Sequence, residues 1–288
     1  MRKTIVITGG DEKFYNLMME CILSLNKVGI RSFAEIGVLN QGLSEHSCSC
    51  IKAMGIKIAN PEWPDFVPSE LRNNNQIGLV SRPYLRDLFP GYDIYLWFDA
   101  DAWAQNSDFY NSYIEGAARE GAAVALENGA GYRKSWREMK WWAGNYISAY
   151  GLKTGLNLSF KNSINIGILA LKNDAAHWGA WTAQYKSIID KTGKLNLDQH
   201  AFHAAIHLNG FRTKLLPARM NWLPILSAPL VEKGSMVLRE PSVNKEVISI
   251  IHLAGPDKER TYNLKGGLDI STSLTYNAYN SLYDSHHS

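Results

Sequence analysis

The stretch that decides the fold is "DIYLWFDAD", residues 93–101, in which an apolar run leads into two carboxylates separated by one alanine. A short run rich in aromatic and aliphatic residues predicts a buried β-strand. Side chains two apart in an extended chain point the same way, so Asp99 and Asp101 would project together from the carboxyl end of this strand. A buried, unpaired carboxylate is costly, so the pair needs a compensating cation or must reach solvent.

Further apolar runs on both sides of this strand alternate with helical patterns. Strands are predicted at "TIVIT" (4–8), "SFAEIGVLN" (32–40), "GIKIA" (55–59), "GAAVALENG" (121–129), "SINIGILALKN" (163–173) and "VISIIHLAG" (247–255), the last of these ending at His252. Helices are predicted at 14–29, 81–92, 175–190 and 197–210, and the Pro- and Asn-rich residues 60–76 read as a loop. Alternating strands and helices predict an α/β fold with parallel strand pairing.

The bulk composition is that of one large α/β domain. The chain has 288 residues, 45% of them hydrophobic and 20% charged, and its net charge of +3 is too small to argue for a nucleic-acid partner. Three cysteines, Cys21, Cys48 and Cys50, give no disulfide framework. No apolar stretch is long enough for a signal peptide or a membrane-spanning helix, so we expect a cytoplasmic protein. The nine tryptophans leave open a peripheral contact with the inner face of the membrane.

The carboxylate pair lies where open α/β sheets bind their ligands, at the carboxyl end of a strand. Two adjacent carboxylates repel each other unless a divalent cation lies beside them. Mn²⁺ and Mg²⁺ prefer oxygen ligands and can bridge to a diphosphate. One interpretation is therefore that the two aspartates hold a metal ion that binds a nucleotide diphosphate. A solvated turn explains the same three residues equally well.

Four more motifs, one before the aspartate pair and three after it, carry a family resemblance. They are "YLRDL" (84–88), Asn165-Ile166-Gly167, Asp198-Gln199 and "HLAGPDK" (252–258). With the aspartate pair, they make the sequence similar to glycosyltransferase family 8 and its relatives with the GT-A fold, from the first strand to about residue 260. The resemblance implies a mostly parallel, Rossmann-like sheet flanked by helices. It also implies a domain at 1–265, with a nucleotide-sugar half at 1–105 and an acceptor half at 106–265, and a partly disordered extension at 266–288.

The resemblance also implies a metal site and a site for the donor diphosphate. Asp99, Asp101 and His252 match the family's ligands for Mn²⁺ or Mg²⁺. Lys258 matches the cation that binds the diphosphate, and Gly255 would let the backbone approach it.

Further residues match those with which the family contacts the base and the sugar of the donor. Arg86 matches the arginine that contacts the donor, although Arg82, one helical turn earlier, is a rival for that role. The nucleobase would lie at the loop after the first strand, and the sugar on the strand of Asn165, where Ile166 replaces the family's alanine. Asp198 and Gln199 match the pair at the reactive face of the sugar. The donor residues implied are Thr8, Gly9, Gly10, Asp11, Arg86, Ala100, Asn165, Gly167, Gly255 and Lys258.

The implied activity is metal-dependent transfer of a hexose from a nucleotide sugar, most simply a UDP-hexose, to a glycan or lipid-linked saccharide. Relatives with this motif set usually transfer with retention, and the residues themselves leave inversion open. The setting of these relatives suggests bacterial surface polysaccharide or lipopolysaccharide synthesis. A sugar-nucleotide pyrophosphorylase is one alternative, but "TGGDEKF" (8–14) lacks the arginine and the length of its loop. A phosphatase using an Asp-x-Asp nucleophile would carry the pair after its first strand. A non-catalytic nucleotide- or glycan-binding module on the same fold is the third.

The acceptor side is the least legible part of the sequence. Residues 132–150, "YRKSWREMKWWAGNYISAY", mix aromatic and basic side chains. They fit a helix with a core stripe and a solvated basic face, or a surface that stacks on sugars and binds phosphate. Glu127 is a further candidate contact for sugar or acceptor. The C-terminal tail is polar with few basic residues, which argues against membrane docking through that tail.

Overall fold

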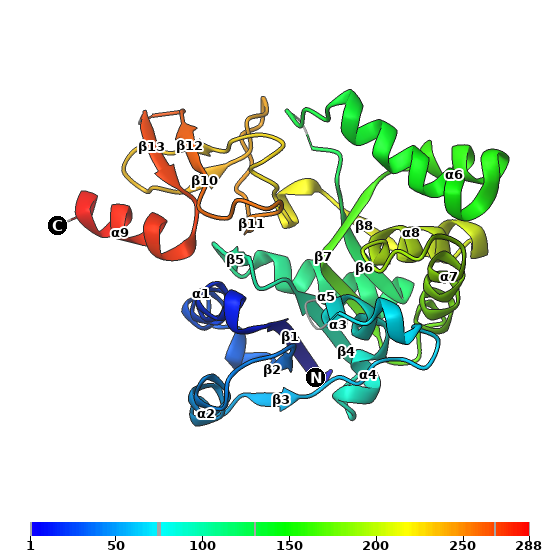
Figure 1. Cartoon of the computed structure of the whole chain (residues 1–288). Coiled ribbons are helices and arrows are strands. Elements are labelled where there is room, and N and C mark those ends of the chain that lie inside the picture. Colours follow the sequence, from blue (N-terminus) through cyan, green and yellow to red (C-terminus); the bar gives the residue numbers. More distant parts are fainter. Residues whose placement is uncertain (1, 74–75, 130, 268, 288) are drawn as a thin grey trace.

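The computed structural model describes residues 2–73, 76–129, 131–267 and 269–287, and a seven-stranded sheet runs through its centre (Figure 1). The strands follow the order β3-β2-β1-β4-β7-β6-β8 across the sheet. In this sheet β7 runs against its two neighbours and the other pairs are parallel, so the sheet is mostly parallel. The strands are β1 (Thr4–Gly10), β2 (Glu35–Asn40), β3 (Lys57–Ala59), β4 (Ile94–Phe98), β6 (Ala122–Leu126), β7 (Ile164–Lys172) and β8 (Lys214–Leu216).

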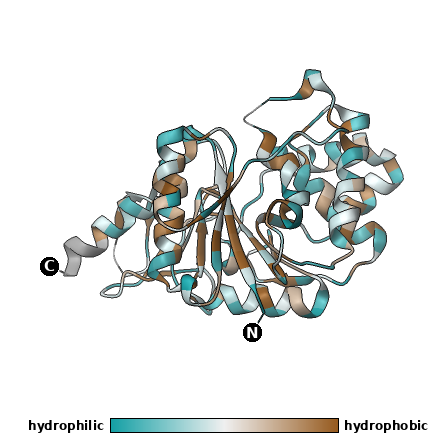
Figure 2. Ribbon diagram, turned by 90° about the horizontal axis from the view of Figure 1, so that it is seen from below, coloured by the Kyte–Doolittle hydropathy of each residue, from teal (hydrophilic) through white to brown (hydrophobic). Residues whose placement is uncertain are grey.

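Helices cover both faces of this sheet, as Figure 2 shows with apolar strands between two helical layers. The α-helices of the described residues are α1 (Tyr15–Lys27), α2 (Glu45–Ala53), α3 (Ile77–Ser81), α4 (Leu85–Leu88), α5 (Asp108–Glu120), α6 (Trp136–Ser159), α7 (His177–Thr192), α8 (Asp198–Asn209) and, in the small lobe described below, α9 (Tyr276–His287). On β4, Tyr95 and Trp97 pack in one core with α7 and α8, whereas Leu96 and Phe98 pack in another with α1 and α5. This alternation follows from the two-residue period of a strand.

A smaller lobe lies beyond the carboxyl end of β4. It holds the two-stranded pairs β5 (Ala102–Ala104) with β11 (Ile250–His252), β9 (Leu230–Val231) with β10 (Leu238–Arg239), and β12 (Thr261–Leu264) with β13 (Ile270–Ser273). These strands and α9 enclose their own apolar core around Trp103 and Trp222. Within the described ranges, no helix combines the length and the apolar character needed to cross a bilayer.

The predicted strands all form, with two differences in how they pair. The strand at 163–173 is β7, which is antiparallel to β4 rather than parallel. The strand predicted at 247–255 forms only over Ile250–His252, pairs with β5 outside the central sheet, and is followed by β12 and β13. Burial alone does not reveal the direction or the partner of a strand, because an apolar run satisfies either arrangement.

Candidate active site

Asp99, Asp101 and His252 meet at the carboxyl end of β4. Asp99 follows the last residue of β4, and the turn through Asp101 leads into β5. β11 pairs antiparallel with β5 so that His252 is opposite Ala102, and the amide of Leu253 donates to the Asp101 carbonyl at 2.9 Å. As a result, His252 Nε2 lies 3.5 Å from Asp99 Oδ2 and 3.4 Å from Asp101 Oδ1.

The chemistry of this cluster fits a divalent cation. Each of the three side chains offers a ligand atom, and these atoms all lie within 4.8 Å of one another. His252 Nδ1 lies 3.0 Å from the side-chain oxygen of Asn221, an oxygen that can only accept, so Nδ1 carries the proton and Nε2 is left to face the carboxylates. Two carboxylates and one such imidazole form a ligand set suited to Mn²⁺ or Mg²⁺.

Gly167 makes room for this cluster. A Cβ atom at residue 167 would lie 2.2 Å from His252 Cε1 and 2.8 Å from Asp99 Oδ2, so a larger residue would collide with two of the three proposed ligands. The Gly167 carbonyl also accepts a hydrogen bond from the Asp99 amide at 2.8 Å. The Gly167 amide donates to Asn165 Oδ1 at 2.9 Å, and that same oxygen accepts from Asn221 Nδ2 at 2.9 Å. Gly167 therefore packs directly against His252, and Asn165 is connected to His252 through Asn221.

Two cations balance the acids of the site. Lys258 forms an ion pair with Asp101 and donates to the Leu253 carbonyl at 2.9 Å. Arg82 is buried, and its guanidinium lies 2.7 Å from Asp99 and 3.0 Å from Asp198. Both cations thus reach the cluster from other parts of the chain.

The proximity of these charges shifts the pKa values of the cluster. Burial opposes the charged form of Asp101, but His252 and Lys258 outweigh it and hold the pKa of Asp101 below its ordinary value. Burial also opposes the charged form of His252, yet Asp101 and Asp99 raise the pKa of that imidazole. At Asp198 burial prevails, helped by the Asp99 charge and opposed by Arg82, so the pKa of Asp198 is raised.

Of the two arginines considered from the sequence, the geometry favours Arg82 over Arg86. Arg86 directs its guanidinium to the carbonyl of Asn173 at 3.3 Å, and its side chain is partly exposed. None of its contacts among the described residues involves the aspartate pair. We therefore propose Arg82, in place of Arg86, for the contact with the donor.

Asp198 and Gln199 both reach the site from the first turn of α8, in different directions. Asp198 turns to Arg82, whereas Gln199 Oε1 accepts a hydrogen bond from the Ile166 amide at 3.2 Å on the neighbouring strand β7. This divergence is expected for adjacent helical residues. The Gln199 contact ties α8 to the strand that carries Asn165 and Gly167.

The loop after β1 is less directly connected to the cluster. Thr8 is fully enclosed in the sheet, and Gly9 and Gly10 are buried beside it. The missing side chain of Gly9 is required by β2, since a Cβ there would lie 2.7 Å from the Leu39 carbonyl oxygen. Asp11 accepts a hydrogen bond from the Phe14 amide at 3.1 Å. Of the predicted base-binding residues, Asp11 is therefore the one with an accessible side chain.

Three other predicted residues differ in their exposure. Ala100 is buried in the turn between the two aspartates. Gly255 is exposed in the loop before Lys258, with φ of 97°, a conformation that favours glycine. Glu127 is half-buried, with its carboxylate 3.8 Å from the Lys134 ammonium, and this burial raises its pKa.

Asn221 was not anticipated from the sequence. It is buried and connects His252 to Asn165. The available signal was an uncharged polar residue inside the mostly apolar run "MNWLPIL" (220–226).

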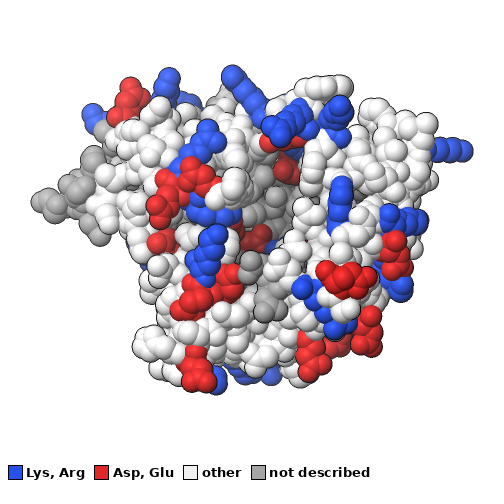
Figure 3. Space-filling model, viewed as in Figure 1, with Lys and Arg blue, Asp and Glu red and all other residues white. Residues whose placement is uncertain are grey.

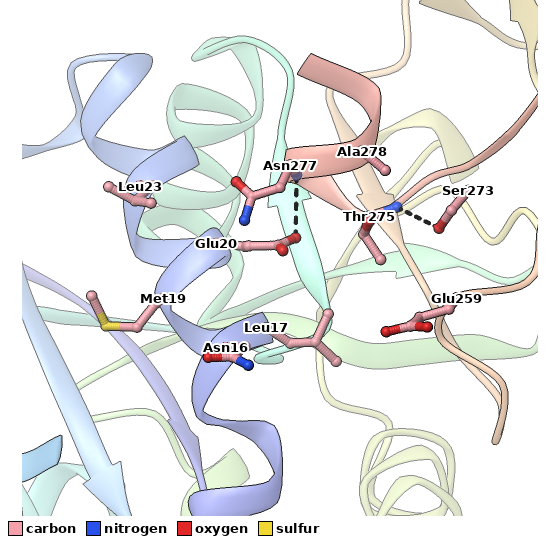
Figure 4. A pocket seen from close by; sticks show the side chains of 10 residues that line it. All are labelled: Asn16, Leu17, Met19, Glu20, Leu23, Glu259, Ser273, Thr275, Asn277 and Ala278. Atoms are coloured by element: carbon pink, nitrogen blue, oxygen red, sulfur yellow. Dashed lines mark hydrogen bonds between the residues drawn. The ribbon is translucent and has the colours of Figure 1, made fainter. Parts of the chain in front are cut away.

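The surface over this region is hollowed. Figure 3 shows a depression near the middle of the face, with acidic side chains visible in it. A separate pocket of about 530 Å³ lies between α1 and the C-terminal residues 273–278 (Figure 4). Its lining includes Glu20 and Glu259 but none of the three proposed metal ligands.

No protein-family model and no curated protein matches the chain. Solved structures do match it, among them the galactosyltransferase LgtC in complex with donor and acceptor sugar analogs, at a TM-score of 0.59 and 12% identity over 98% of this chain and 95% of that one. An active-site variant of LgtC matches at 0.60 with 14% identity, over the same shares of the two chains.

Two further matches belong to longer proteins. The glycosyltransferase GlyE of Streptococcus pneumoniae TIGR4, in its apo form, matches at a TM-score of 0.55 and 14% identity, over 97% of this chain and 59% of that one. The bifunctional WbbM matches at 0.58 and 14%, over 89% and 46%.

The fold is of the GT-A type. In that GT-A frame, the aspartate pair follows the fourth strand along the chain, and the small lobe supplies His252 and Lys258 from the other side. The sequence identity is low, so this likeness defines the architecture and leaves the activity to be argued from the site.

Proposed function

We propose that the chain is a metal-dependent glycosyltransferase that moves a hexose from a nucleotide sugar, a UDP-hexose, to a glycan or lipid-linked saccharide. The observation that carries this proposal is the convergence of Asp99, Asp101 and His252 on one point, flanked by Arg82 and Lys258. The GT-A architecture supports it. We further propose retention of anomeric configuration and a role in bacterial surface polysaccharide or lipopolysaccharide synthesis, on the family resemblance of the motifs.

In this reaction the bond between the sugar and the diphosphate breaks, and negative charge develops on the leaving oxygen. A bound divalent cation supplies Lewis-acid stabilisation of that charge. Lys258 and Arg82 add two fixed positive charges beside the metal ligands, where they need no rearrangement as the bond breaks. Gln199 and Asp198 line the side of the site next to β7, and we assign them to the reactive face of the sugar.

The experiment is a thermal-shift panel of nucleotide sugars with and without Mn²⁺, followed by transfer assays. A ligand that binds only the folded protein raises its melting temperature, so we expect a UDP-sugar to do so in the presence of Mn²⁺ and much less with a chelator. Asp101→Ala should remove this shift and lower transfer by at least about 1,000-fold, the scale of a lost metal contact.

Asp174→Ala is the matched control, since Asp174 is an exposed carboxylate paired with Lys172. It should behave as the unsubstituted protein does. Transfer that is equal with and without chelator would rule out the metal-dependent mechanism. Binding of the nucleotide sugar without any turnover would instead favour a non-catalytic module.

A further inference from the structure

The segment 131–163, which we call the α6 segment, is longer than the sheet requires. It connects β6 to β7, which are antiparallel neighbours. Such strands can be joined by a turn of two residues. Here the chain instead leaves the sheet, forms the long helix α6, and returns at Ile164. Sheet topology therefore does not explain the α6 segment.

The α6 segment also carries the positive charge of the molecule. It contains six basic residues and one acidic residue, Glu138, whereas the whole chain has a net charge of only +3. The remainder of the chain is therefore slightly negative. Figure 3 shows Lys and Arg side chains gathered at the top of the face, around the start of α6. Local charge of this kind favours an anionic partner.

Large apolar side chains are exposed on the same segment. Trp136 is 76% exposed and Phe160 is 86% exposed. Of the eleven large hydrophobic residues that are exposed in the described parts of the chain, six lie here: Trp136, Met139, Trp141, Leu152, Leu156 and Phe160. Such a concentration of exposed apolar groups marks a site of interaction with a protein, a membrane or a ligand.

Four of these six, Trp136, Met139, Leu156 and Phe160, border a groove of about 650 Å³, a volume typical of ligand sites. The groove forms because α6 bends at Gly151, whose φ of 76° and ψ of 169° are not helical, so the helix folds back on itself. Its lining is mostly apolar, with Trp142, Tyr146 and Leu158 among the buried or half-buried members, and Lys140 and Lys161 exposed at its edge.

One end of the groove is polar and leads toward the site. Asn128, Lys134 and Ser163 line it there, and Ser163 donates to Asn128 Oδ1 at 3.2 Å. Ser163 lies two residues before Asn165 on the way into β7. This polar end of the groove therefore lies at the start of β7, the strand whose Asn165 and Gly167 lie behind the aspartate cluster.

We propose that the groove of the α6 segment binds the aliphatic chain of an anionic lipid, with the lipid phosphate near Lys140 and Lys161. An aliphatic chain gains free energy from an apolar groove at about 0.8 kcal/mol per buried methylene group. Exposed tryptophan and lysine side chains around such a groove are typical of a membrane interface, where rings lie at head-group level and ammonium groups extend to phosphates. The site goes beyond the proposed transfer reaction and does not depend on it.

The test uses vesicles of equal parts phosphatidylglycerol and phosphatidylcholine, in which some acyl chains carry bromine. If the protein binds these vesicles, it should float with them in a density gradient. Because bromine quenches tryptophan fluorescence on contact, the bound protein should also lose fluorescence. A Trp136→Phe variant should lose a smaller fraction of its fluorescence, because Trp136 lines the groove. Vesicles of phosphatidylcholine alone should bind much less, and excess inorganic phosphate should not release the protein.

Two double variants separate the apolar and the charged contributions. Met139→Glu with Phe160→Glu should abolish quenching, and Lys140→Glu with Lys161→Glu should weaken binding by at least about 30-fold, from about 1 kcal/mol for each lysine. Val243→Glu is the matched control, because Val243 is 98% exposed outside the segment. All these side chains are exposed, so the variants should keep the melting temperature of the parent.

The proposal is overturned if the unsubstituted protein fails to float, if it floats without quenching, or if both double variants bind as the control does. It is also overturned if phosphate alone releases the protein. The Mn²⁺-dependent thermal shift with a UDP-sugar, measured on the same variants, reports the proposed function separately. Loss of quenching with an intact shift therefore concerns the groove alone.

Discussion

At the scale of single residues, Asn221 determines which ring nitrogen of His252 faces the two aspartates. Its side-chain oxygen lies 3.0 Å from His252 Nδ1, and its amide group donates to Asn165 Oδ1 at 2.9 Å. The first contact fixes the tautomer of the imidazole, and the second fixes the asparagine to β7. Partners of this kind orient a metal-binding histidine and raise its basicity.

Asn221→Ala should weaken binding of Mn²⁺ by about 10- to 100-fold, because Nδ1 loses the acceptor that keeps Nε2 available for the metal. The measurement is calorimetric titration of Mn²⁺ in the presence of UDP. Asn221→Asp keeps an oxygen opposite Nδ1 and should bind Mn²⁺ more tightly than the alanine variant does. Equal affinity in the alanine variant and the parent would show that Asn221 has no part in the site.

The sequence predicted the aspartate pair, His252 and Lys258 as one group, and the structure brings these four residues together. It assigned the donor contact to Arg86, with Arg82 as a rival, whereas we now propose Arg82. Residues four apart share a face only on a continuous helix. Over the predicted helix at 81–92 the chain instead forms the last residue of α3, a 3-10 turn over Arg82–Tyr84, and α4. The guanidinium groups of the two arginines therefore contact different partners. A local break of this kind depends on tertiary packing.

At the scale of elements, α6 explains why two interpretations of residues 132–150 stayed open. Its beginning follows sequence rules, since Ser135 and Glu138 cap the first turn reciprocally. Its apolar residues do not form one stripe, because some face solvent and others face α8. The helix α5 and the strand β5, which follow the aspartate turn, were not predicted.

Buried imidazoles join α6 to α8. His203 accepts a hydrogen bond from the Tyr146 hydroxyl, 2.8 Å from Nδ1, and donates from Nε2 to the Asn162 carbonyl at 3.1 Å. The ring of His200 stacks on Trp142 with centroids 4.1 Å apart. Burial, together with the neighbouring imidazoles, lowers the pKa of His200 and that of His203 to about 3 from 6.5.

These values predict that stability falls as the pH drops from about 6.5 toward 3. Above that window both folded and unfolded states hold neutral imidazoles; within it only the unfolded chain takes up protons, which costs roughly 1 kcal/mol per pH unit for each histidine. Urea unfolding at about pH 7 and pH 5 measures this loss. His203→Gln should lose less between the two, and an unchanged pH dependence in that variant would contradict the assignment.

At the scale of the whole molecule, the C-terminal residues close the small lobe. In the extension at 266–288, which was expected to be partly disordered, the described residues include β13 and α9; partial disorder of this extension stays a prediction. Trp103 donates to the Leu274 carbonyl at 2.8 Å and packs between the rings of Tyr276 and Tyr279. On the other side, Glu20 of α1 accepts a hydrogen bond from the Asn277 amide at 3.4 Å (Figure 4).

Tyr279→Ala should therefore lower the free energy of unfolding by about 3–5 kcal/mol, as expected for a large aromatic side chain removed from a core. Tyr279→Phe removes only the hydroxyl that donates to the Met236 carbonyl and should cost about 1 kcal/mol. Denaturant unfolding of both variants measures the difference. Equal, small losses would mean that this end of the chain is not part of the cooperative unit.

The sequence also predicted most of the central sheet, because each buried strand has its own apolar run. The reversal of β7 was not predictable, since pairing direction depends on the path of the connections. The division into a donor half at 1–105 and an acceptor half at 106–265 stays a prediction.

The pairing of β5 with β11 has a consequence for how the protein is made. Asp99 and Asp101 leave the ribosome early, whereas His252 follows about 150 residues later and Lys258 after it. A partly synthesised chain thus holds two acids without the imidazole that completes their set. The proposed metal could therefore bind its full set of ligands only after residue 252 has been made and β11 has paired with β5.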